Sequence, residues 1–297
     1  MLSTVDELAR QIRLEFDFRR EARIMDAVAR QFDGLRGGRI QVPRSVPSMV
    51  TPRLLVMNFL DGVPITRMKD HIGFKNLSEA TKKMAAKRIL TTVSEAYGRM
   101  VLLDGLFQAD GHPGNILVMK RGRIGLIDYG QSKRLPDEYR RSFAALVVAL
   151  ADGDERRVSE ALDGLGVVTE RSSSSSSSNR GTNSSAESIA QRKQQEEQKL
   201  KADVARGMFD TSGKADPFDP ESPIKKIGIK TFPRDIFFVL RVVQLLRGLA
   251  DGMGVKDFSS AKQWKPFAED TLRQLPASVS LGLVPFIYIS SLQQQED

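Results

Sequence analysis

The chain has 297 residues, of which 40% are hydrophobic and 28% charged, an ordinary composition for a globular protein with room for a sizeable core. It has no cysteine and only two histidines, His71 and His112, which excludes disulfides, thiolate metal sites and cysteine nucleophiles and disfavours a histidine-rich metal centre. The net charge of +8 is scattered through stretches that are also rich in Glu and Asp, which argues against nucleic-acid binding and fits anionic nucleotides or an anionic membrane surface.

The first third of the chain predicts a long helix followed by short strands. Residues 3–32 have apolar side chains at helical spacing, and Thr4 with Glu7 forms a candidate capping box at the start. After the glycines of "GLRGG", residues 40–65 predict two short strands, of which "RLLVMNF" is expected to be buried. Residues 79–103 return to helical periodicity, with apolar side chains spaced alternately four and three apart.

The middle of the chain reads "LFQADGHPGNILVMKRGRIGLIDYGQSKRL" over residues 106–135. It predicts a loop, the strand "NILVM", a turn at "KRGR", the strand "IGLID" and a second loop. Because the second strand of a hairpin returns to where the first began, we expect the loops at its two ends to lie close together. Two helices should follow, at residues 139–153 and 154–166.

Low-complexity sequence interrupts the second half of the chain. Residues 171–188 include a run of serines and cannot bury enough apolar surface to become ordered, while residues 191–201 predict a solvated helix. Two further helices are expected, at residues 232–255 with Gly254 as the stop and at residues 260–275. No apolar run reaches the roughly 20 residues that cross a bilayer, so no transmembrane span is predicted.

The middle segment supplies, in order, the groups that phosphoryl transfer requires. This chemistry needs Mg²⁺ on the phosphates, carboxylate and amide oxygens to hold the metal, and a base that orients the acceptor hydroxyl. Asp110 is followed five residues later by Asn115, and Asp128 lies across the hairpin, just before Tyr129-Gly130. Each short stretch alone is also an ordinary turn sequence, but their ordered occurrence around one hairpin matches the catalytic loop and the D-F-G triplet of protein kinases.

The stretches "FQADGHPGNILV" and "IGLIDYGQSKRL" closely resemble the hallmark sequences of the UbiB/AarF-domain (ADCK) family of atypical kinases. "LEFDFRREARIM", "VPRSVPSMVTPRLLVMNFLDGVPI" and "RVVQLLRGL" are similar to further segments of that family. The resemblance implies an α+β, protein-kinase-like fold, with a truncated N-lobe and a mainly helical C-lobe that carries a catalytic β-hairpin. It covers most of the chain outside roughly 168–222. On this basis residues 1–60 form a partial N-lobe, 61–167 the catalytic part of the C-lobe, 168–222 a disordered insertion and 223–297 the last C-lobe helices.

The resemblance implies roles for the middle segment, with ATP and Mg²⁺ as cofactors. Asp110 corresponds to the catalytic-loop aspartate, Asn115 to a metal ligand and Asp128 to the main Mg²⁺ ligand. His112, a lone histidine inside the loop, is expected to be structural and not a proton shuttle.

The resemblance also implies roles upstream. Glu21 corresponds to the glutamate that pairs with the nucleotide-binding lysine, and Glu15 and Asp17 correspond to the family's E-x-D pair. Helix geometry predicts that Asp17 and Glu21 share a face and that Glu15 points elsewhere. The alternative is a helix face on which Arg13, Arg19 and Arg20 pair locally with these acids. The interlobe hinge, whose backbone would meet adenine, corresponds to Met57, Asn58, Phe59 and Leu60.

Three departures from the family pattern qualify this assignment. The first lysine is Lys69, so no lysine precedes the helix that contains Glu21; we therefore expect a fragment or natural truncation that binds Mg-ATP weakly or not at all. Gly111 replaces the usual proline in the catalytic loop, and Asn58 stands where the family often has Glu.

The leading functional hypothesis is an atypical kinase or ATPase, which the resemblance links to prenylquinone lipid metabolism (coenzyme Q or plastoquinone type) and to mitochondria or plastids. A pseudokinase that binds or scaffolds without turnover is the alternative, favoured by the missing lysine and opposed by Asp110, Asn115 and Asp128. A small-molecule phosphotransferase of the aminoglycoside or choline type is disfavoured, because His112 follows Asp110 and Asp128 lacks a second acid two residues away.

Overall fold

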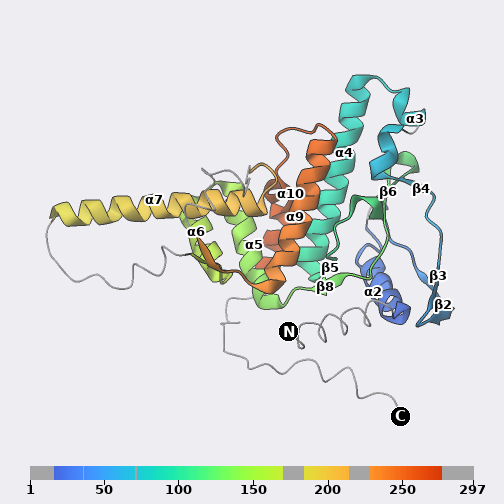
Figure 1. Ribbon diagram of the computed structural model, residues 1–297, viewed down its shortest axis with the longest axis horizontal. Helices are drawn as coiled ribbons and strands as arrows, with labels where there is room; N and C mark the ends of the chain where they lie inside the picture. The colour runs from blue at the N-terminus through green and yellow to red at the C-terminus, as the bar shows by residue number, and fades with distance from the viewer. Residues whose placement is uncertain (1–16, 36, 71, 170–183, 214–227, 276–297) are drawn as a thin grey trace, which may run out of the picture.

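The computed structural model describes residues 17–35, 37–70, 72–169, 184–213 and 228–275. Its first helix, α2 (Phe18–Gln31), begins at Asp17, whose side chain accepts a hydrogen bond from the N–H of Arg19. The capping box expected at Thr4 and Glu7 lies outside the described residues. One face of α2 is buried, through Ala22, Met25, Val28 and Ala29. The helix lies beside the strands β2 (Ser45–Thr51) and β3 (Leu54–Met57) at one end of the molecule (Figure 1).

A four-stranded sheet positions the central hairpin. Its order is β1 (Ile40–Gln41), β7 (Ile124–Leu126), β6 (Ile116–Met119) and β4 (Gly62–Pro64), with β1 parallel to β7 and the other pairs antiparallel. The predicted "NILVM"/"IGLID" hairpin is thereby confirmed as β6–β7. Two shorter pairs are antiparallel as well: β5 (Leu106–Gln108) with β8 (Ser132–Arg134), and β9 (Val168–Thr169) with β10 (Ile229–Thr231).

The prediction that "RLLVMNF" is a buried strand is wrong. β3 pairs only with β2 in a two-stranded ribbon, and Leu54 at its start is 51% exposed. A two-stranded ribbon has no second layer over most of its surface, so apolar content alone did not indicate burial here.

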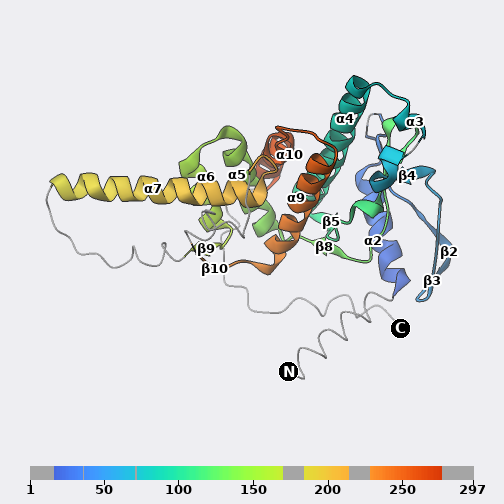
Figure 2. The same cartoon turned by 45° about the horizontal axis from the view of Figure 1, so that its top comes forward.

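The larger part of the molecule is helical, as predicted. α4 (Glu79–Gly98) is capped by Ser78 and runs into a π-helical turn (Arg99–Asp104) that ends at Gly105, whose φ is +68°. α5 (Asp137–Asp152), α6 (Glu155–Gly164), α9 (Arg234–Gly252) and α10 (Ser260–Gln274) pack with it around one core (Figures 1 and 2). α10 crosses α4 at the buried Trp264, whose indole Nε1–H donates to the carbonyl of Ser94 at 2.7 Å.

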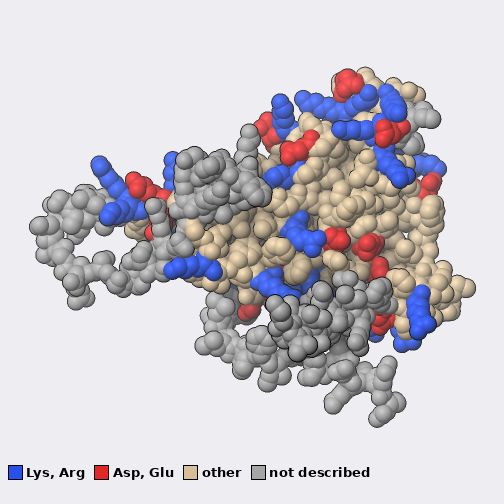
Figure 3. Space-filling model, viewed as in Figure 1, with Lys and Arg blue, Asp and Glu red and all other residues tan. Residues whose placement is uncertain are grey.

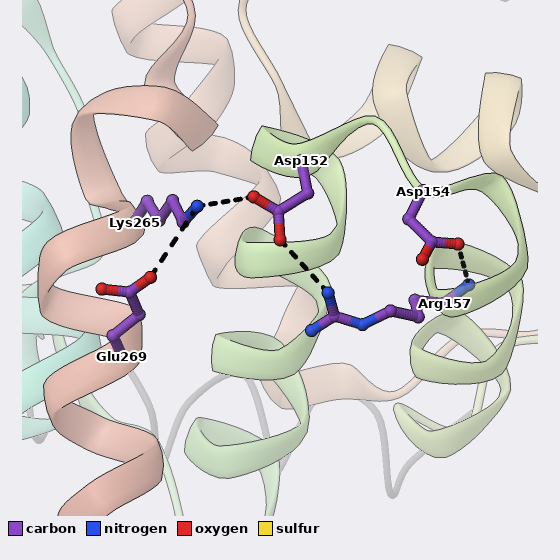
Figure 4. Close-up of polar contacts among 5 residues, drawn as sticks. All are labelled: Asp152, Asp154, Arg157, Lys265 and Glu269. Carbon is purple, nitrogen blue, oxygen red and sulfur yellow. Dashed lines mark hydrogen bonds and ion pairs between the residues drawn. The ribbon is translucent and has the colours of Figure 1, made fainter.

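Charged side chains link the end of α5 to the first turn of α6 and to the middle of α10 (Figure 4). Asp152, the last residue of α5, accepts from Lys265 of α10 at 2.5 Å and from Arg157 of α6 at 3.1 Å. Asp154 caps α6 by accepting from the backbone N–H of Arg157. The hydrogen bond from Lys265 is the main reason that the pKa of Asp152 lies below its ordinary value.

The expectation that residues 168–222 form a disordered insertion is wrong for much of that range. α7 (Ser184–Phe209) is a continuous helix that extends away from the helical bundle in both views (Figures 1 and 2). Its last turns are held in the core by five buried apolar residues: Ala202, Val204, Ala205, Met208 and Phe209. Residues 191–196 are exposed, which confirms a solvated helix there, and the serine run lies outside the described residues.

Two short helices lie between β4 and α4. A 3₁₀ helix, η1 (Ile65–Asp70), follows β4, and the short α3 (Ile72–Lys75) precedes α4. In the parts of the chain that the structure describes, no helix is both long enough and apolar enough to cross a membrane.

Candidate active site

The β6–β7 hairpin brings Asn115 and Asp128 together. Ile116 pairs with Leu126, and the N–H of Ile127 donates to the carbonyl of Asn115 at 3.0 Å, so the register continues to the ends of both strands. The side-chain amide of Asn115 donates to the Asp128 carboxylate at 3.2 Å. The prediction that these two residues are neighbours is therefore confirmed.

Asp128 has a left-handed backbone, with φ at +71°, which is uncommon for a residue with a side chain. Its carboxylate accepts from the N–H of Gly130 at 3.2 Å, a local bond that favours this conformation. The side-chain amide of Gln108 also donates to the carbonyls of Ile127 and Asp128, at 2.8 and 2.6 Å. The surrounding structure thus holds the strained residue in one orientation.

Gln108 is itself fixed by a buried tyrosine. The hydroxyl of Tyr97, in α4, donates to the Gln108 side-chain carbonyl at 2.7 Å, and both residues are buried. Burial raises the pKa of Tyr97 far above its ordinary value, so the hydroxyl remains a donor across the accessible pH range. Sequence reasoning did not identify Gln108 or Tyr97, because neither residue type indicates a buried support by itself.

Asp110 lies in the loop that follows β5. The N–H groups of Ala109 and Asp110 both donate to the carbonyl of Gln131, at 2.8 and 3.3 Å, so this loop is attached to the one after Asp128. Nδ1 of His112 accepts from the N–H of Gly114 at 3.0 Å, which confirms its structural role in the loop.

The side chain of Asp110 is paired with a cation that the sequence did not reveal. The guanidinium of Arg241, in α9, donates to Oδ1 of Asp110 at 2.7 Å. The two residues are 131 positions apart, and the packing of α9 against the loop that contains Asp110 brings them together.

Glu21 contacts the turn after Asp128, and among the described residues it contacts no lysine. One carboxylate oxygen accepts from the N–H of Tyr129 at 3.1 Å, while Arg20 donates to the carbonyl of Gly130 at 3.2 Å. Within the described part of the chain, no ion pair involves Glu21. Burial raises the pKa of Glu21, the Tyr129 N–H opposes that rise, and the nearby Asp128 charge adds to it.

The other predicted upstream residues are not brought into this site. Asp17 is the N-cap of α2, and its carboxylate accepts from the N–H of Arg19 in the helix's own first turn. Glu15 and Arg13 lie outside the described residues. Among the described residues Arg20 forms no ion pair; it donates to the Gly130 carbonyl, and its charge lowers the pKa of Glu21.

The predicted hinge is only partly packed. Leu60 is buried against Leu117 and Met119, while Met57, Asn58 and Phe59 are exposed, Phe59 to 87%. Asn58 forms two hydrogen bonds with the backbone of Arg44. Its side-chain oxygen accepts from the Arg44 N–H at 2.5 Å, and its own N–H donates to the Arg44 carbonyl at 3.1 Å. Asn58 therefore links the end of β3 to the segment between β1 and β2.

The donor set at the end of the hairpin suits Mg²⁺ with phosphate, and not a metal held by protein alone. Among the described residues, no three His, Cys, Asp or Glu side chains gather as a metal cluster. Mg²⁺ characteristically takes one or two protein oxygens and completes its shell with water and phosphate. The Asp128 carboxylate and the side-chain oxygen of Asn115 fit that requirement. The nitrogen of the same Asn115 amide donates to Asp128.

Comparison with known proteins places the chain among atypical kinases. The model of the ABC1 atypical kinase-like domain matches residues 1–162. Similar curated proteins include AarF domain-containing kinase 1 of Drosophila melanogaster, 27% identical over 55% of this chain and 30% of that one. Protein ACTIVITY OF BC1 COMPLEX KINASE 8, chloroplastic, of Arabidopsis thaliana is 24% identical over 93% of this chain and 37% of that one.

A solved structure supports the fold. The Rv3197–erythromycin complex of Mycobacterium tuberculosis superposes with a TM-score of 0.57 at 18% identity, covering 91% of this chain and 61% of that one. The chain spans less than half the length of the curated relatives it matches. These matches confirm the α+β, kinase-like fold and the resemblance on which the site residues were assigned. The chain belongs to the ABC1 atypical kinase-like domain family.

Proposed function

We propose that the end of the β6–β7 hairpin binds Mg-ATP and serves phosphoryl transfer. The observation that carries this proposal is the pairing of Asn115 with Asp128 at 3.2 Å, next to the loop that contains Asp110. Family membership supports it, because the matched model and the named relatives are kinase-like.

The residues divide the work in the following way. The Asp128 carboxylate and the Asn115 amide oxygen would hold Mg²⁺, which neutralises charge on the phosphates when it is bound. Asp110 orients the acceptor hydroxyl and receives its proton. The supports from Gln108 and Gly130 keep the Asp128 carboxylate in place, so little reorganisation is needed when the nucleotide binds.

Asp128→Asn tests the nucleotide part of this proposal. Asn keeps the size of the side chain and tolerates a left-handed backbone, but it removes the charge that attracts Mg²⁺. We expect millimolar Mg-ATP to raise the melting temperature of the wild-type chain and to leave that of Asp128→Asn unchanged, as measured by differential scanning fluorimetry.

The matched control is Asp257→Asn. Asp257 is also a left-handed aspartate, with φ at +59°, and it is exposed in the loop before α10. This variant should show the full wild-type shift, and no shift should appear with EDTA. An equal shift in Asp128→Asn and the wild type would show that the nucleotide binds elsewhere.

A binding or scaffold protein without turnover is the second candidate. Two observations favour it: Arg241 occupies the Asp110 carboxylate, and no lysine in the described residues contacts Glu21. Phosphate release from ATP separates the candidates. An enzyme loses that release in Asp110→Asn, while a scaffold shows the Mg-ATP shift with no release in either protein.

We also propose association with an anionic membrane surface and a link to prenylquinone lipid metabolism in a plastid or mitochondrion. The word chloroplastic in the names of two Arabidopsis relatives supports the organelle. The distribution of charge supports the proposed membrane association: Lys and Arg gather at the top of the molecule in Figure 3, over the start of α4 in Figure 1. Exposed basic residues there include Lys75, Lys83, Lys87 and Arg88.

A further inference from the structure

A cavity of about 620 Å³ opens beside the catalytic loop. It lies between η1, the loop residues Gly111 and Pro113, and one face of α9. Cavities of roughly 300–1,000 Å³ hold small organic molecules, and this one is next to the side chain proposed to receive the acceptor's proton. Gly111 permits the arrangement, because a β-carbon there would come within 3.0 Å of Leu245 on α9.

The lining of the cavity indicates the chemistry of its occupant. Apolar side chains such as Met68, Leu245 and Leu249 form its walls. Among the described residues that line it, the charged ones, Lys69 and Arg241, are both cations, and none is Asp or Glu. An apolar molecule with one anionic group matches these walls better than a cation or an uncharged polar molecule.

Arg241 connects the cavity to Asp110, the proposed catalytic residue. It lines the cavity and donates to Oδ1 of Asp110 at 2.7 Å. Its side chain is 40% exposed, so its position is set by this pairing and not by close packing. An anion in the cavity therefore competes with Asp110 for the same guanidinium.

We propose that this cavity is the acceptor site of the phosphoryl transfer and takes a small apolar molecule that carries a hydroxyl and one anionic group, whose anion draws Arg241 away from Asp110. The inference rests on the proposed function. In the transfer, the acceptor oxygen bonds to the γ-phosphorus of ATP as the bond to the ADP oxygen breaks, and the hydroxyl proton passes to Asp110. Until the acceptor binds, the ion pair with Arg241 would keep the Asp110 carboxylate from accepting a proton.

Two glycines of α9 leave the cavity open and provide a way to fill it. Gly248 and Gly252 both line it, and a β-carbon on either would meet no heavy atom within 4 Å. Gly248→Leu should place a side chain in the cavity without a backbone clash and should favour the helix. Gly164→Leu is the matched control, because Gly164 also has open space at its β-carbon and lies in α6, outside the cavity.

The experiment titrates the purified 297-residue chain with two fluorescent probes of similar shape, without nucleotide. 1-Anilinonaphthalene-8-sulfonate is an apolar anion, and N-phenyl-1-naphthylamine is its uncharged counterpart. Gly248→Leu should weaken both probes about tenfold, as loss of most of the buried contact implies, and Gly164→Leu should match the wild type. Equal affinities in the two variants would overturn the cavity as the binding site.

Two further variants test the competition for Arg241. Arg241→Gln should weaken the anionic probe about tenfold, the loss of one charge-assisted contact, and leave the neutral probe within about twofold. Asp110→Asn releases the guanidinium and should strengthen the anionic probe severalfold, again with no change for the neutral one. An unchanged anionic affinity in Asp110→Asn would overturn the competition. These titrations contain no nucleotide. Their outcome therefore does not depend on whether the chain binds Mg-ATP in the fluorimetry experiment.

Discussion

At the scale of single residues, the orientation of Asp128 depends on one buried amide. Gln108 donates to two successive carbonyls and accepts from Tyr97, so three polar groups would lose a partner if its amide were removed. Gln108→Leu keeps the approximate size of the side chain but provides neither donor nor acceptor. We expect the free energy of unfolding to fall by about 2 kcal/mol or more, since each buried polar group left unpaired costs about 1–3 kcal/mol.

Urea unfolding measures this change, with Gln131→Leu as the control. Gln131 is exposed in the neighbouring loop, and that substitution should change the free energy of unfolding by less than about 0.5 kcal/mol. If Gln108→Leu were as mild as the control, the contacts of Gln108 would not support the Asp128 turn.

Glu21 gives a pH-dependent prediction. Its pKa is raised above the ordinary value of 4.5, chiefly by burial, so the folded protein holds the proton more tightly than the unfolded chain does. The stability contributed at this residue is therefore present below the unfolded pKa and is lost as the pH rises through the folded pKa. Glu21→Gln should make the protein more stable than the wild type at pH 7, by less than about 1 kcal/mol because Glu21 is only partly buried.

The measurement is urea unfolding of both proteins at neutral and acidic pH. At about pH 4, where most of the wild-type carboxyl is protonated in both states, the two stabilities should converge. A variant less stable than the wild type at pH 7 would show that a cation pairs with Glu21 in solution.

The residues of the site differed in how well the sequence predicted them. Asn115 and Asp128 were predicted as neighbours because they flank one hairpin, and strand pairing fixes such distances locally. Arg241 and Gln108 were not, since their contacts depend on how α9 and α4 pack against the loops. Side chains that act through long-range packing leave no spacing pattern in a single sequence.

At the scale of elements, the crossing of α4 and α10 depends on the absence of a side chain. A β-carbon on Gly98 would overlap the indole ring of the buried Trp264. Alanine is the better helix former, yet Gly98→Ala should lower the free energy of unfolding by about 1–3 kcal/mol, because the overpacked helices must separate.

Gly248→Ala is the control for this change, since open space surrounds that position on α9. It should raise the free energy of unfolding by about 0.5–1 kcal/mol, the usual gain for replacing glycine inside a helix. Both values come from urea unfolding under the same conditions. A stabilised Gly98→Ala would mean that α4 and α10 are further apart in solution.

The elements also differed in how far periodicity predicted them. α4, α5, α6, α9 and α10 were predicted because each has apolar side chains at helical spacing. α7 was assigned mainly to a disordered segment because its first part is polar, while its anchor in the core is confined to a few residues near Phe209. A composition averaged over the whole segment concealed that short apolar end.

At the scale of the whole molecule, the distribution of charge predicts where a membrane would bind. Lys83 and Lys87 lie on the exposed side of α4 beside Met84, which is 68% exposed. Reversing both charges, as Lys83→Glu with Lys87→Glu, should reduce cosedimentation with vesicles of phosphatidylcholine and phosphatidylglycerol. Each basic residue near such a surface contributes about 1 kcal/mol, so we expect at least about a tenfold loss of partitioning.

The control has the same change of charge at a different place. Arg192→Glu with Lys193→Glu alters two exposed residues of α7, and partitioning should stay within about twofold of the wild type. Vesicles of phosphatidylcholine alone should bind none of the proteins. Equal losses in the two double variants would mean that net charge, and not this face, governs the association.

The contacts of α2 with the turn after Asp128 have a mechanical consequence. Glu21 accepts from the N–H of Tyr129, and Arg20 donates to the carbonyl of Gly130. One helix therefore binds the backbone of the two residues that follow Asp128, the proposed metal ligand. Asn115 is held by the other strand of the hairpin, and in the described part of the chain it forms no hydrogen bond to α2. A displacement of α2 would therefore change the separation between the two proposed ligands, and with it the affinity of the proposed site for magnesium.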